Sequence, residues 1–475
     1  MAKNKRLIAL LIAAIMIISL AACGGSDTPP PLSTPSGNNA AATPGEDIVR
    51  VMFSVAGGKD EAEMELFVQA IYDATGITVI AEKPASDYDN IMMQKLQAGE
   101  VFELIQVNAP HYLNLAEQGA LLDITDRIEA SEILTNNVDP REWDDIRVNG
   151  RIYAGFSKVE LHRVVSLNRN HLENAGIDYT QIEPTLDGYL AVFRALRAAN
   201  SDPDYFPFNA VLSLSYDLQP WMAAAGLKAG TVIDADGQRY SPYSTDESIP
   251  IWEWLRTLYQ EGLLDPGSFV DETRDLREKM GAASQRTSVV VDWAMWVGLH
   301  NGNATAGGIA EEDFEVVPLP GVRTPDGGHM LVKGAANLFM VPRNAENVDG
   351  AIRLLEFFAT QEGGDLLQIG IYGHDYNIVD GQAVLTEIGI AHNMDHGAPI
   401  PIYRNWVPML PLNRGVDAGL ALLPYASIQR IIPNNRDWEE VTGRWGIQII
   451  RGELDAAAAL EGMRNELILL DVVDR

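Results

Sequence analysis

The segment 289–296 places three groups that could hold a ligand at the end of a predicted strand. Asp292 closes the apolar run 289–291, and Trp293 and Trp296 follow three residues apart, on one side of a helix that begins there. Ligands bind at strand ends in open α/β sheets. Flat indole faces beside a carboxylate suit noncovalent binding of a neutral sugar, which has apolar ring faces and hydroxyl edges. The alternative is that both indoles pack in the core.

Other aromatic side chains stand at a helix start or in a loop. Trp221 follows Asp217-Leu218-Gln219-Pro220 at a helix start, and Trp143 precedes a predicted hairpin among acidic residues. Tyr403 and Trp406 lie in a Pro-rich loop, and loops carry more than their share of binding residues. We predict ligand contacts for these four. The alternative for Trp221 is core packing, and the alternative for Trp143 is that it covers the hairpin. Trp252 and Trp254 are two apart in a predicted helix, so only one can face inward, and we expect them in the core or on the surface. We expect Trp438 and Trp445 to pack.

Polar candidates stand at the exits of two predicted strands. Asn108 and His111 follow the third strand, at its carboxyl end. Ser54 begins the exit of the first strand, 54–58, which contains two glycines that let a ligand approach the backbone. We predict ligand contacts for Ser54, Asn108 and His111.

A further polar group lies where we suspect a connection between lobes. Tyr372, His374 and Asp375 are close together there, and packing at a hinge is the alternative to ligand contact. Arg163 and Arg404 could pair with an acidic sugar.

Composition excludes several other chemistries. The net charge of −31, from 66 acidic and 35 basic residues, disfavours nucleic-acid binding. A single cysteine excludes a disulfide scaffold and a Cys-rich zinc or iron–sulfur site, and the eight histidines form no H-E-x-x-H motif. No P-loop or Rossmann fingerprint is present. Asp234-Ala235-Asp236-Gly237 resembles the beginning of a calcium loop but lacks the Glu at position twelve. We therefore expect no metal and no cofactor.

An enzymatic mechanism has little support in the sequence. With 66 acidic residues, some carboxylate pair falls at glycosidase spacing by chance, so the count is uninformative. Gly155-Phe156-Ser157-Lys158 lacks the closing glycine of a nucleophile elbow. We expect a protein without catalytic residues.

The N-terminus has the pattern of a secretory signal. Basic residues precede the segment 7–22, which is apolar apart from one serine and is shorter than a bilayer span. Leu20-Ala21-Ala22-Cys23-Gly24 is similar to the bacterial lipobox, whose cysteine accepts the lipid. We expect a signal peptide over 1–22, lipidation of Cys23 and a disordered tether over 23–46. The alternative is an ordinary secretory signal with a chance cysteine.

Strand and helix patterns alternate from residue 48, which implies a parallel sheet with helices on its faces. Strands are predicted over 48–55, 77–81 and 102–107, and helices over 60–75 and 111–118. Val148-Asn149-Gly150-Arg151 predicts a type I′ hairpin. The pattern changes near Arg163 and strands resume near residue 336, which supports two lobes.

Four stretches together resemble one family. They are Glu117–Thr125, Val148–Ala154, Leu258–Pro266 and Gly373–Tyr376 with the following Asp380-Gly381. With the lipobox they resemble the family 1 extracellular solute-binding lipoproteins of bacterial ABC importers, and especially the oligosaccharide-binding branch, which includes alginate-binding proteins. Gly373-His374-Asp375 departs from the Gly-Ile-Glu-Gly common in that family. Many relatives carry a calcium loop, but the matching stretch 200–205 has too few carboxylates for us to carry calcium over.

The resemblance implies a two-lobed α/β fold of the periplasmic-binding-protein type. Each lobe would have a mainly parallel sheet flanked by helices, with the ligand cleft between the lobes. It also implies that the position of Trp293 contacts sugar and that Trp221 lies near the cleft. We place crossovers near Val165, Lys333 and Asn377, so that lobe 1 comprises 47–164 and 333–377, and lobe 2 comprises 165–332 and 378–475.

The function that we expect is that of a substrate-binding lipoprotein of an ABC transporter. A monomer on the extracytoplasmic face of the cell membrane would bind an oligosaccharide, close its lobes around it and deliver it to the permease subunits. Two alternatives stay open. One is a binder of a non-sugar solute, such as a peptide or a cation, and the other is an extracellular glycoside-processing enzyme.

Overall fold

The computed structural model describes residues 47–475 except 214, 335, 393 and 429–434. The predicted signal peptide, the lipidation of Cys23 and the tether lie outside the described residues. Within these ranges, no helix is both long enough and apolar enough to cross a membrane.

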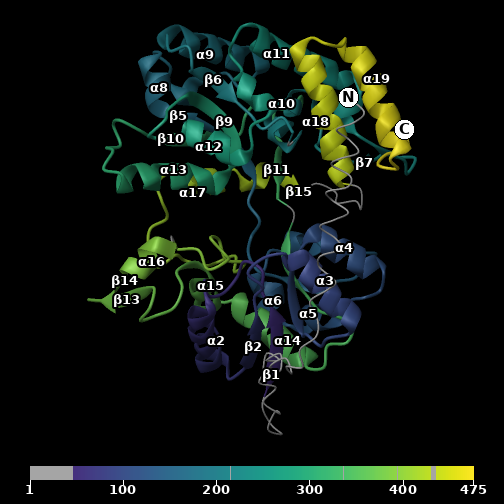
Figure 1. Cartoon of the computed structure of the whole chain (residues 1–475), viewed down its shortest axis with the longest axis vertical. Coiled ribbons are helices and arrows are strands. Elements are labelled where there is room, and N and C mark those ends of the chain that lie inside the picture. The colour runs from purple at the N-terminus through teal and green to yellow at the C-terminus, as the bar shows by residue number, and fades with distance from the viewer. Residues whose placement is uncertain (1–46, 214, 335, 393, 429–434) are drawn as a thin grey trace, which may run out of the picture. The chain divides into compact units, whose positions relative to one another are not determined.

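A five-stranded sheet is the centre of the first lobe (Figure 1), in the order β2-β1-β3-β12-β4. Its strands are β2 (Thr78–Glu82), β1 (Ile48–Met52), β3 (Leu104–Asn108), β12 (Asn337–Met340) and β4 (Ala154–Phe156). β1 pairs in parallel with β2 and β3, whereas β12 is antiparallel to both β3 and β4. A strand from late in the chain therefore lies between two strands from the first third of it.

Helices with local sequence signals pack against this sheet. They are α2 (Glu61–Thr75), α3 (Tyr88–Ala98), α4 (Ala109–Glu117), α5 (Thr125–Ala130), α6 (Glu132–Asn137), α7 (Pro140–Asp145), α14 (Val348–Phe358) and α15 (Gln361–Gln368). Asp60 caps α2 by accepting from the Glu63 N–H at 2.9 Å, and Gly76 in the left-handed region ends it. The helix predicted over 60–75 is thereby confirmed.

Four phenylalanines join the elements of the first core. Phe53, just after β1, contacts Phe67 of α2 and Phe339 of β12 edge to face, with ring centroids 6.0 and 5.9 Å apart. Phe339 also stacks on Phe358 of α14 at 5.4 Å. All four are fully buried, so this cluster holds the late strand β12 between helices from both ends of the lobe.

A four-stranded sheet is the centre of the second lobe, in the order β10-β5-β9-β6. Its strands are β10 (Val316–Leu319), β5 (Arg163–Asn168), β9 (Thr287–Trp293) and β6 (Phe206–Asn209). Its helices are α8 (Arg169–Asn174), α9 (Leu186–Ala199), α10 (Gln219–Met222), α11 (Ile249–Gln260), α12 (Thr273–Met280), α13 (Ala294–Ala306), α17 (Val416–Leu420), α18 (Asn435–Arg451) and α19 (Ala456–Leu469). The predicted two-lobed α/β class is confirmed.

The strand pairing is mixed, in contrast to the mainly parallel sheets that we expected. In the second sheet β5 is antiparallel to both β10 and β9, and only β6 and β9 run in parallel. β5 and β9 are neighbours in the sheet although β6, β7, β8 and several helices lie between them in the chain. Strand direction depends on such long connections, which local periodicity does not record.

The third crossover lies later than we predicted. The chain passes between the sheets from β4 to β5 and from β11 (Leu331–Lys333) to β12. We expected a third passage near Asn377, but Ala398 and Ile402 are buried in the core of the first lobe. The segment after Asn377 forms the hairpin β13 (Tyr376–Val379)–β14 (Gln382–Leu385) and α16 (Glu387–His392) before it reaches these residues. The crossover therefore follows Ile402.

Tight hairpins occur where turn residues predicted them. Val148 and Arg151 exchange backbone hydrogen bonds of 2.9 and 3.0 Å, with Asn149 and Gly150 both at positive φ, as a type I′ turn requires. The stretch 234–237 is the tip of the short hairpin β7 (Val232–Ile233)–β8 (Arg239–Tyr240). A parallel pair of β11 and β15 (Ala426–Ile428) completes the described strands.

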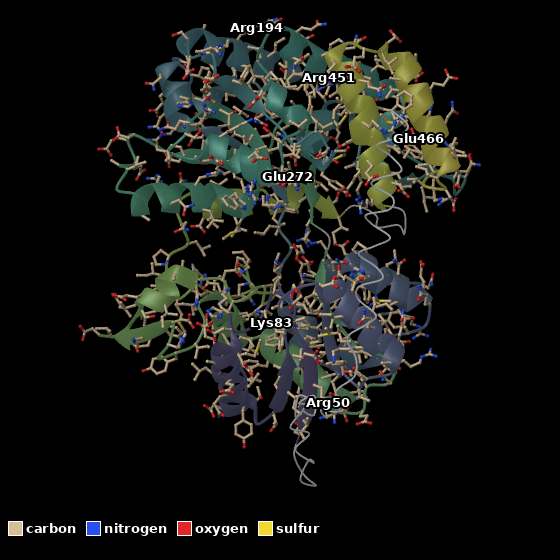
Figure 2. The ribbon with its side chains drawn as sticks, in the orientation of Figure 1. Arg50, Lys83, Arg194, Glu272, Arg451 and Glu466 are labelled. Carbon is tan, nitrogen blue, oxygen red and sulfur yellow. The ribbon has the colours of Figure 1, made fainter. Side chains whose placement is uncertain are left out.

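Charged side chains on the surface join elements within each lobe (Figure 2). Arg50 of β1 lies 3.3 Å from the Glu103 carboxylate, which is buried. Arg194 of α9 donates to Glu261 at 2.7 Å, and both of these side chains are exposed. An exposed pair of this kind contributes only about 0–1 kcal/mol.

We predict that Gly155→Ala destabilises the protein. An ideal Cβ on Gly155 of β4 would lie 2.7 Å from both methyl groups of buried Leu355. Overpacking of this kind costs about 1–3 kcal/mol in the free energy of unfolding, which urea denaturation measures. Gly281→Ala is the control, because φ is −59° there and the nearest atoms lie at 3.4 Å. Equal stability of the two variants would contradict the predicted packing.

Candidate ligand-binding site

A cavity of about 430 Å³ is lined by residues of both lobes. The first lobe contributes α7 and the segment 400–408, and the second contributes α17, the 3-10 turn Leu423–Tyr425 and β15. Two predicted ligand contacts, Tyr403 and Trp406, line it together. Its volume falls in the range typical of small-molecule sites, about 300–1,000 Å³.

A buried ion pair lies in the wall of the cavity. Lys333 Nζ donates to the Glu142 carboxylate, and the two side chains are only 7% and 11% exposed. Asp145, one turn after Glu142, also lines the cavity, and burial raises the pKa of its carboxyl although Lys333 opposes the shift. A buried charge is tolerated where it is paired, so the Lys333–Glu142 pair fixes α7 against β11.

Trp406 is held in place by two first-lobe side chains. Its Nε1 donates to Asp365 Oδ1 at 2.9 Å, and Gln361 Nε2 donates to the same oxygen at 2.9 Å. Burial raises the pKa of Asp365, although the hydrogen bond from Trp406 opposes the shift. The indole therefore has a fixed orientation while part of it remains exposed, which suits a stacking surface.

The charged groups of the lining nearly balance. Four carboxylates and three cationic groups line the cavity, and Arg141 pairs with Asp139 at 2.9 Å. The hydrogen bond from Arg141 holds the pKa of Asp139 below its ordinary value. The remaining lining is mostly aliphatic. Such a cavity offers donors, acceptors and apolar faces without a strong field of either sign.

Two predicted ligand contacts, Trp221 and Trp143, are buried in the cores instead. Trp221 is fully buried, with its ring 4.9 Å from Tyr189 and 5.5 Å from Phe208. Trp143 is 6% exposed and packs on Phe156. A tryptophan at a helix start has the same sequence signature whether it faces a cleft or a core, so we correct both assignments.

The Asp292 carboxylate is also buried, in an ion pair within the second lobe. Its carboxylate accepts two hydrogen bonds from Arg277, at 2.7 and 2.8 Å, and the side chain is 1% exposed. A carboxylate that is buried and paired in this way has little capacity left for a ligand, which corrects its predicted role.

Trp293 and Trp296 are half-buried, and each has a guanidinium on its ring. The Arg163 Cζ lies 4.5 Å from the Trp293 ring centroid, and the Arg277 Cζ lies 3.9 Å from that of Trp296. Arg163 is itself paired with buried Asp217, so it is not available for the acidic sugar that we considered. Neither indole lines the cavity, although both remain partly exposed.

The polar candidates of the first lobe hold local structure. Asn108 caps α4 by accepting from the His111 N–H at 3.2 Å, and the His111 ring lies 3.0 Å from the same oxygen. The Ser54 N–H donates to Gln106 Oε1 at 2.9 Å. Tyr372 is 65% exposed and lies outside this cavity.

Sequence reasoning missed residues that organise the first lobe and the wall of the cavity. Gln106 is fully buried, and its Oε1 accepts the N–H groups of Ser54, Val55 and Ala56 while its Nε2 donates to Asn337. Glu142 and Lys333 were also missed as cavity residues. The acidic cluster around Trp143 was visible in the sequence, but the partner of Glu142 lies 191 residues away.

Two α/β lobes that both line one cavity define a protein of the solute-binding class. A profile of the bacterial extracellular solute-binding protein family matches residues 56–365. The chain belongs to this family, whose members work outside the cytoplasm and bind solutes.

Solved structures share the fold at low sequence identity. The sugar-binding protein MalE from Xanthomonas citri is 14% identical with a TM-score of 0.67, covering 89% of this chain and 98% of its own. An ABC substrate-binding protein from Listeria monocytogenes in complex with cycloalternan is 14% identical with a TM-score of 0.63, covering 90% and 99%. The alginate-binding protein AlgQ2 is 15% identical with a TM-score of 0.62, covering 90% and 95%. No curated protein matches the sequence.

We predict that Lys333→Met strongly destabilises the protein. The substitution leaves Glu142 buried without its partner, which costs roughly 3–5 kcal/mol in the free energy of unfolding. Adding Glu142→Gln should recover most of the loss, and chemical denaturation of the three proteins measures it.

Arg194→Met is the matched control for this prediction, because it breaks the ion pair of Arg194 with Glu261, in which both side chains are exposed. If Lys333→Met costs no more than this control, the buried pair does not fix the wall of the cavity.

Proposed function

We propose that this solute-binding protein captures an extracellular oligosaccharide in the cavity between α7, the segment 400–408 and α17. The observation that carries the proposal is that Tyr403 and Trp406 both line the cavity. Trp406 is oriented by its hydrogen bond to Asp365, and the lining also contains charged groups that can form hydrogen bonds. Sugar rings present apolar faces to aromatic rings and hydroxyl groups to planar polar side chains.

The charge of the lining favours a neutral sugar over a uronate or a polyamine. Lys333 pairs with Glu142 and Arg141 with Asp139. The third cation of the lining, Arg404, shares the cavity with two further carboxylates, so there is no excess of cations for an anionic sugar. Glu142 and Asp139 are taken up by these two pairs, so only part of the carboxylates in the lining remains for a polycation. The hydroxyl groups of a neutral sugar can donate hydrogen bonds to the carboxylates of these pairs and accept them from the cationic groups.

Proteins of the same fold give the proposal its partner. The titles of their structures describe sugar-binding and ABC substrate-binding proteins, and we extend that role to this chain. Binding of the sugar favours a closed arrangement of the lobes. The closed protein then delivers the sugar to the ABC permease subunits. The proposed protein acts as a monomer and makes or breaks no bond.

Two partly exposed indoles outside the cavity extend the proposed site. Trp293 ends β9 and Trp296 lies in the first turn of α13, and their partly exposed rings suit additional sugar units of a longer chain. We propose that they are secondary contacts, together with Ser54, Asn108, His111 and Tyr372. Substitution of any of these residues should weaken sugar binding less than substitution of Trp406.

We further propose that the protein is anchored to the outer face of the cell membrane. The support is the lipobox-like Leu20–Gly24 after a short apolar segment. Several acyl chains on Cys23 would hold the protein stably, since one chain alone binds a membrane only marginally.

Trp406→Leu should weaken oligosaccharide binding about ten-fold, which is on the order of 1.4 kcal/mol. The substitution removes the proposed stacking surface from the cavity. Tryptophan fluorescence and calorimetry with a panel of neutral oligosaccharides measure the effect.

Trp445→Leu is the matched control. Its Nε1 also donates to a carboxylate, that of Glu466 at 2.8 Å, and the indole is also half-buried, but it does not line the cavity. Saturable binding of a peptide or a polyamine, with no response to sugars, would replace the proposal by the non-sugar alternative. Turnover of the sugar would instead indicate an enzyme.

Cys23→Ser should release the protein from the membrane. Without the thiol there is no lipid acceptor, so the variant should appear in the soluble extracellular fraction and incorporate no labelled palmitate. Membrane association equal to that of the unmodified sequence would contradict lipidation at this residue, and it would leave the sugar proposal untouched.

A further inference from the structure

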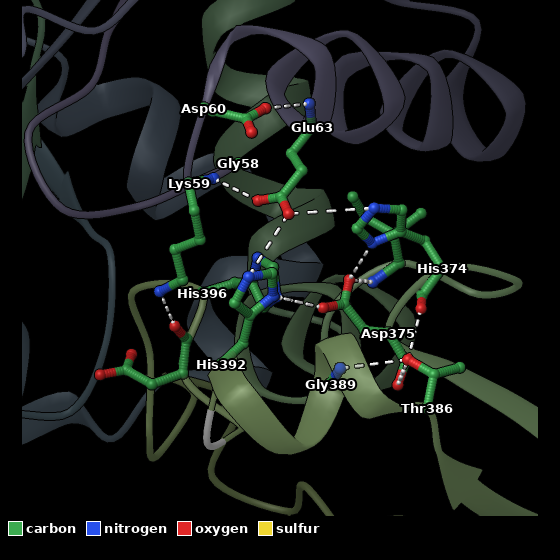
Figure 3. A network of polar contacts seen from close by, with 12 residues as sticks. Gly58, Lys59, Asp60, Glu63, His374, Asp375, Thr386, Gly389, His392 and His396 are labelled. Atoms are coloured by element: carbon green, nitrogen blue, oxygen red, sulfur yellow. Dashed lines mark hydrogen bonds and ion pairs between the residues drawn. The ribbon is translucent and has the colours of Figure 1, made fainter.

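Three histidines and two carboxylates converge in the first lobe (Figure 3): His374, His392, His396, Glu63 and Asp375. None of them lines the cavity. Asp375 precedes β13, His392 is the last residue of α16, and His396 follows in the next loop. Glu63 reaches the group from α2, more than 300 residues earlier in the chain. The fold thus gathers into one place side chains that the sequence keeps far apart.

Two imidazole nitrogens face one carboxylate oxygen. Asp375 Oδ1 lies 2.7 Å from His392 Nδ1 and 3.0 Å from His396 Nε2. Asp375 and His396 are fully buried, and the three donor atoms lie within 4.8 Å of one another. Tetrahedral zinc, with bonds of about 2.0–2.1 Å to nitrogen and oxygen, holds neighbouring donors about 3.3–3.4 Å apart. An opening of a few tenths of an ångström would accommodate the ion.

The two carboxylates that face His392 are the second observation that points to an ion. Its Nδ1 faces Asp375, and its Nε2 lies 3.3 Å from Glu63 Oε1. A neutral imidazole carries one proton and can donate to only one of these carboxylates. A metal ion on Nδ1 removes the conflict, because Nε2–H then donates to Glu63, as in the carboxylate–histidine–metal arrangement of many zinc sites.

The surroundings hold the three donor groups close together. The Ile371 N–H donates to Asp375 Oδ2 at 2.8 Å, which leaves Oδ1 toward the histidines. An ideal Cβ on Gly370 would lie 2.5 Å from His396 Nε2, so the backbone approaches the group more closely than a side chain would allow. His396 Nδ1 is buried and has no hydrogen-bond partner among the described residues.

We propose that Asp375, His392 and His396 bind a divalent ion of the zinc type, with Glu63 orienting His392 from behind. Imidazole nitrogen favours such ions over calcium or magnesium, which prefer oxygen. Two histidines and one aspartate supply three ligands, and water takes the fourth position. The ion joins β13 and α16 to the rest of the first lobe, and the proposal is independent of which solute the cavity binds.

Titration of the chelator-treated full chain with zinc chloride tests the proposal. We expect one equivalent to bind, a rise in the melting temperature, and visible absorption bands of tetrahedral coordination when cobalt replaces zinc. His392→Gln and His396→Gln should each weaken zinc binding at least 100-fold, because an amide is a poor ligand for zinc. Glu63→Gln should weaken it about ten-fold, the effect usual for a group behind a ligand.

His329→Gln is the matched control, since His329 is partly buried in another part of the chain and its Nδ1 contacts the Val322 carbonyl at 3.1 Å. It should bind zinc as the unmodified chain does. If the histidine variants fail to fold, Glu63→Gln and the cobalt spectrum of the unmodified chain still decide the question. Absence of stoichiometric zinc binding, or equal affinity in the variants, would overturn the proposal.

Discussion

Paired charges buried at the passages between the lobes are the constraint on which the candidate site depends. Lys333 with Glu142, Arg163 with Asp217 and Arg277 with Asp292 all stand at or beside these passages, and at least one partner of each pair is almost completely buried. Removing such a group from water costs several kcal/mol unless its partner is correctly placed. The pairs therefore restrict the geometry of the connections more than they add to stability.

The buried pairs hold the side chains around the cavity in fixed orientations. The Lys333–Glu142 pair fixes α7 on one side of the cavity, and the Asp365–Trp406 hydrogen bond fixes the segment 400–408 on another. The guanidinium groups of the other two pairs lie on the rings of Trp293 and Trp296. A binding protein gains affinity when its contacts are ordered before the ligand arrives, because less entropy is then lost on binding.

The sequence predicted the local elements and the two-lobed class because both rest on short-range patterns. The helix over 60–75 and the hairpin at 148–151 each carry their own cap or turn residues. Strand direction and the third crossover were predicted less well, since they depend on where distant segments pack. For the same reason the sequence could not show that Trp406 lines the cavity and that Trp221 does not. Burial of Trp221 is decided by neighbours such as Phe208 and Tyr189.

The position of β12 has a consequence for how the protein reaches its folded state. This strand lies between β3 and β4, although the chain must be complete to residue 340 before it can pair. A polypeptide that emerges N-terminus first therefore carries an open edge on β3 and lacks the central ring of Phe339 until more than two thirds of it has been made. Late closure of this kind slows folding, because contacts between distant segments must form before the sheet is complete. The sheet of the first lobe therefore reaches its final order only when most of the chain is available.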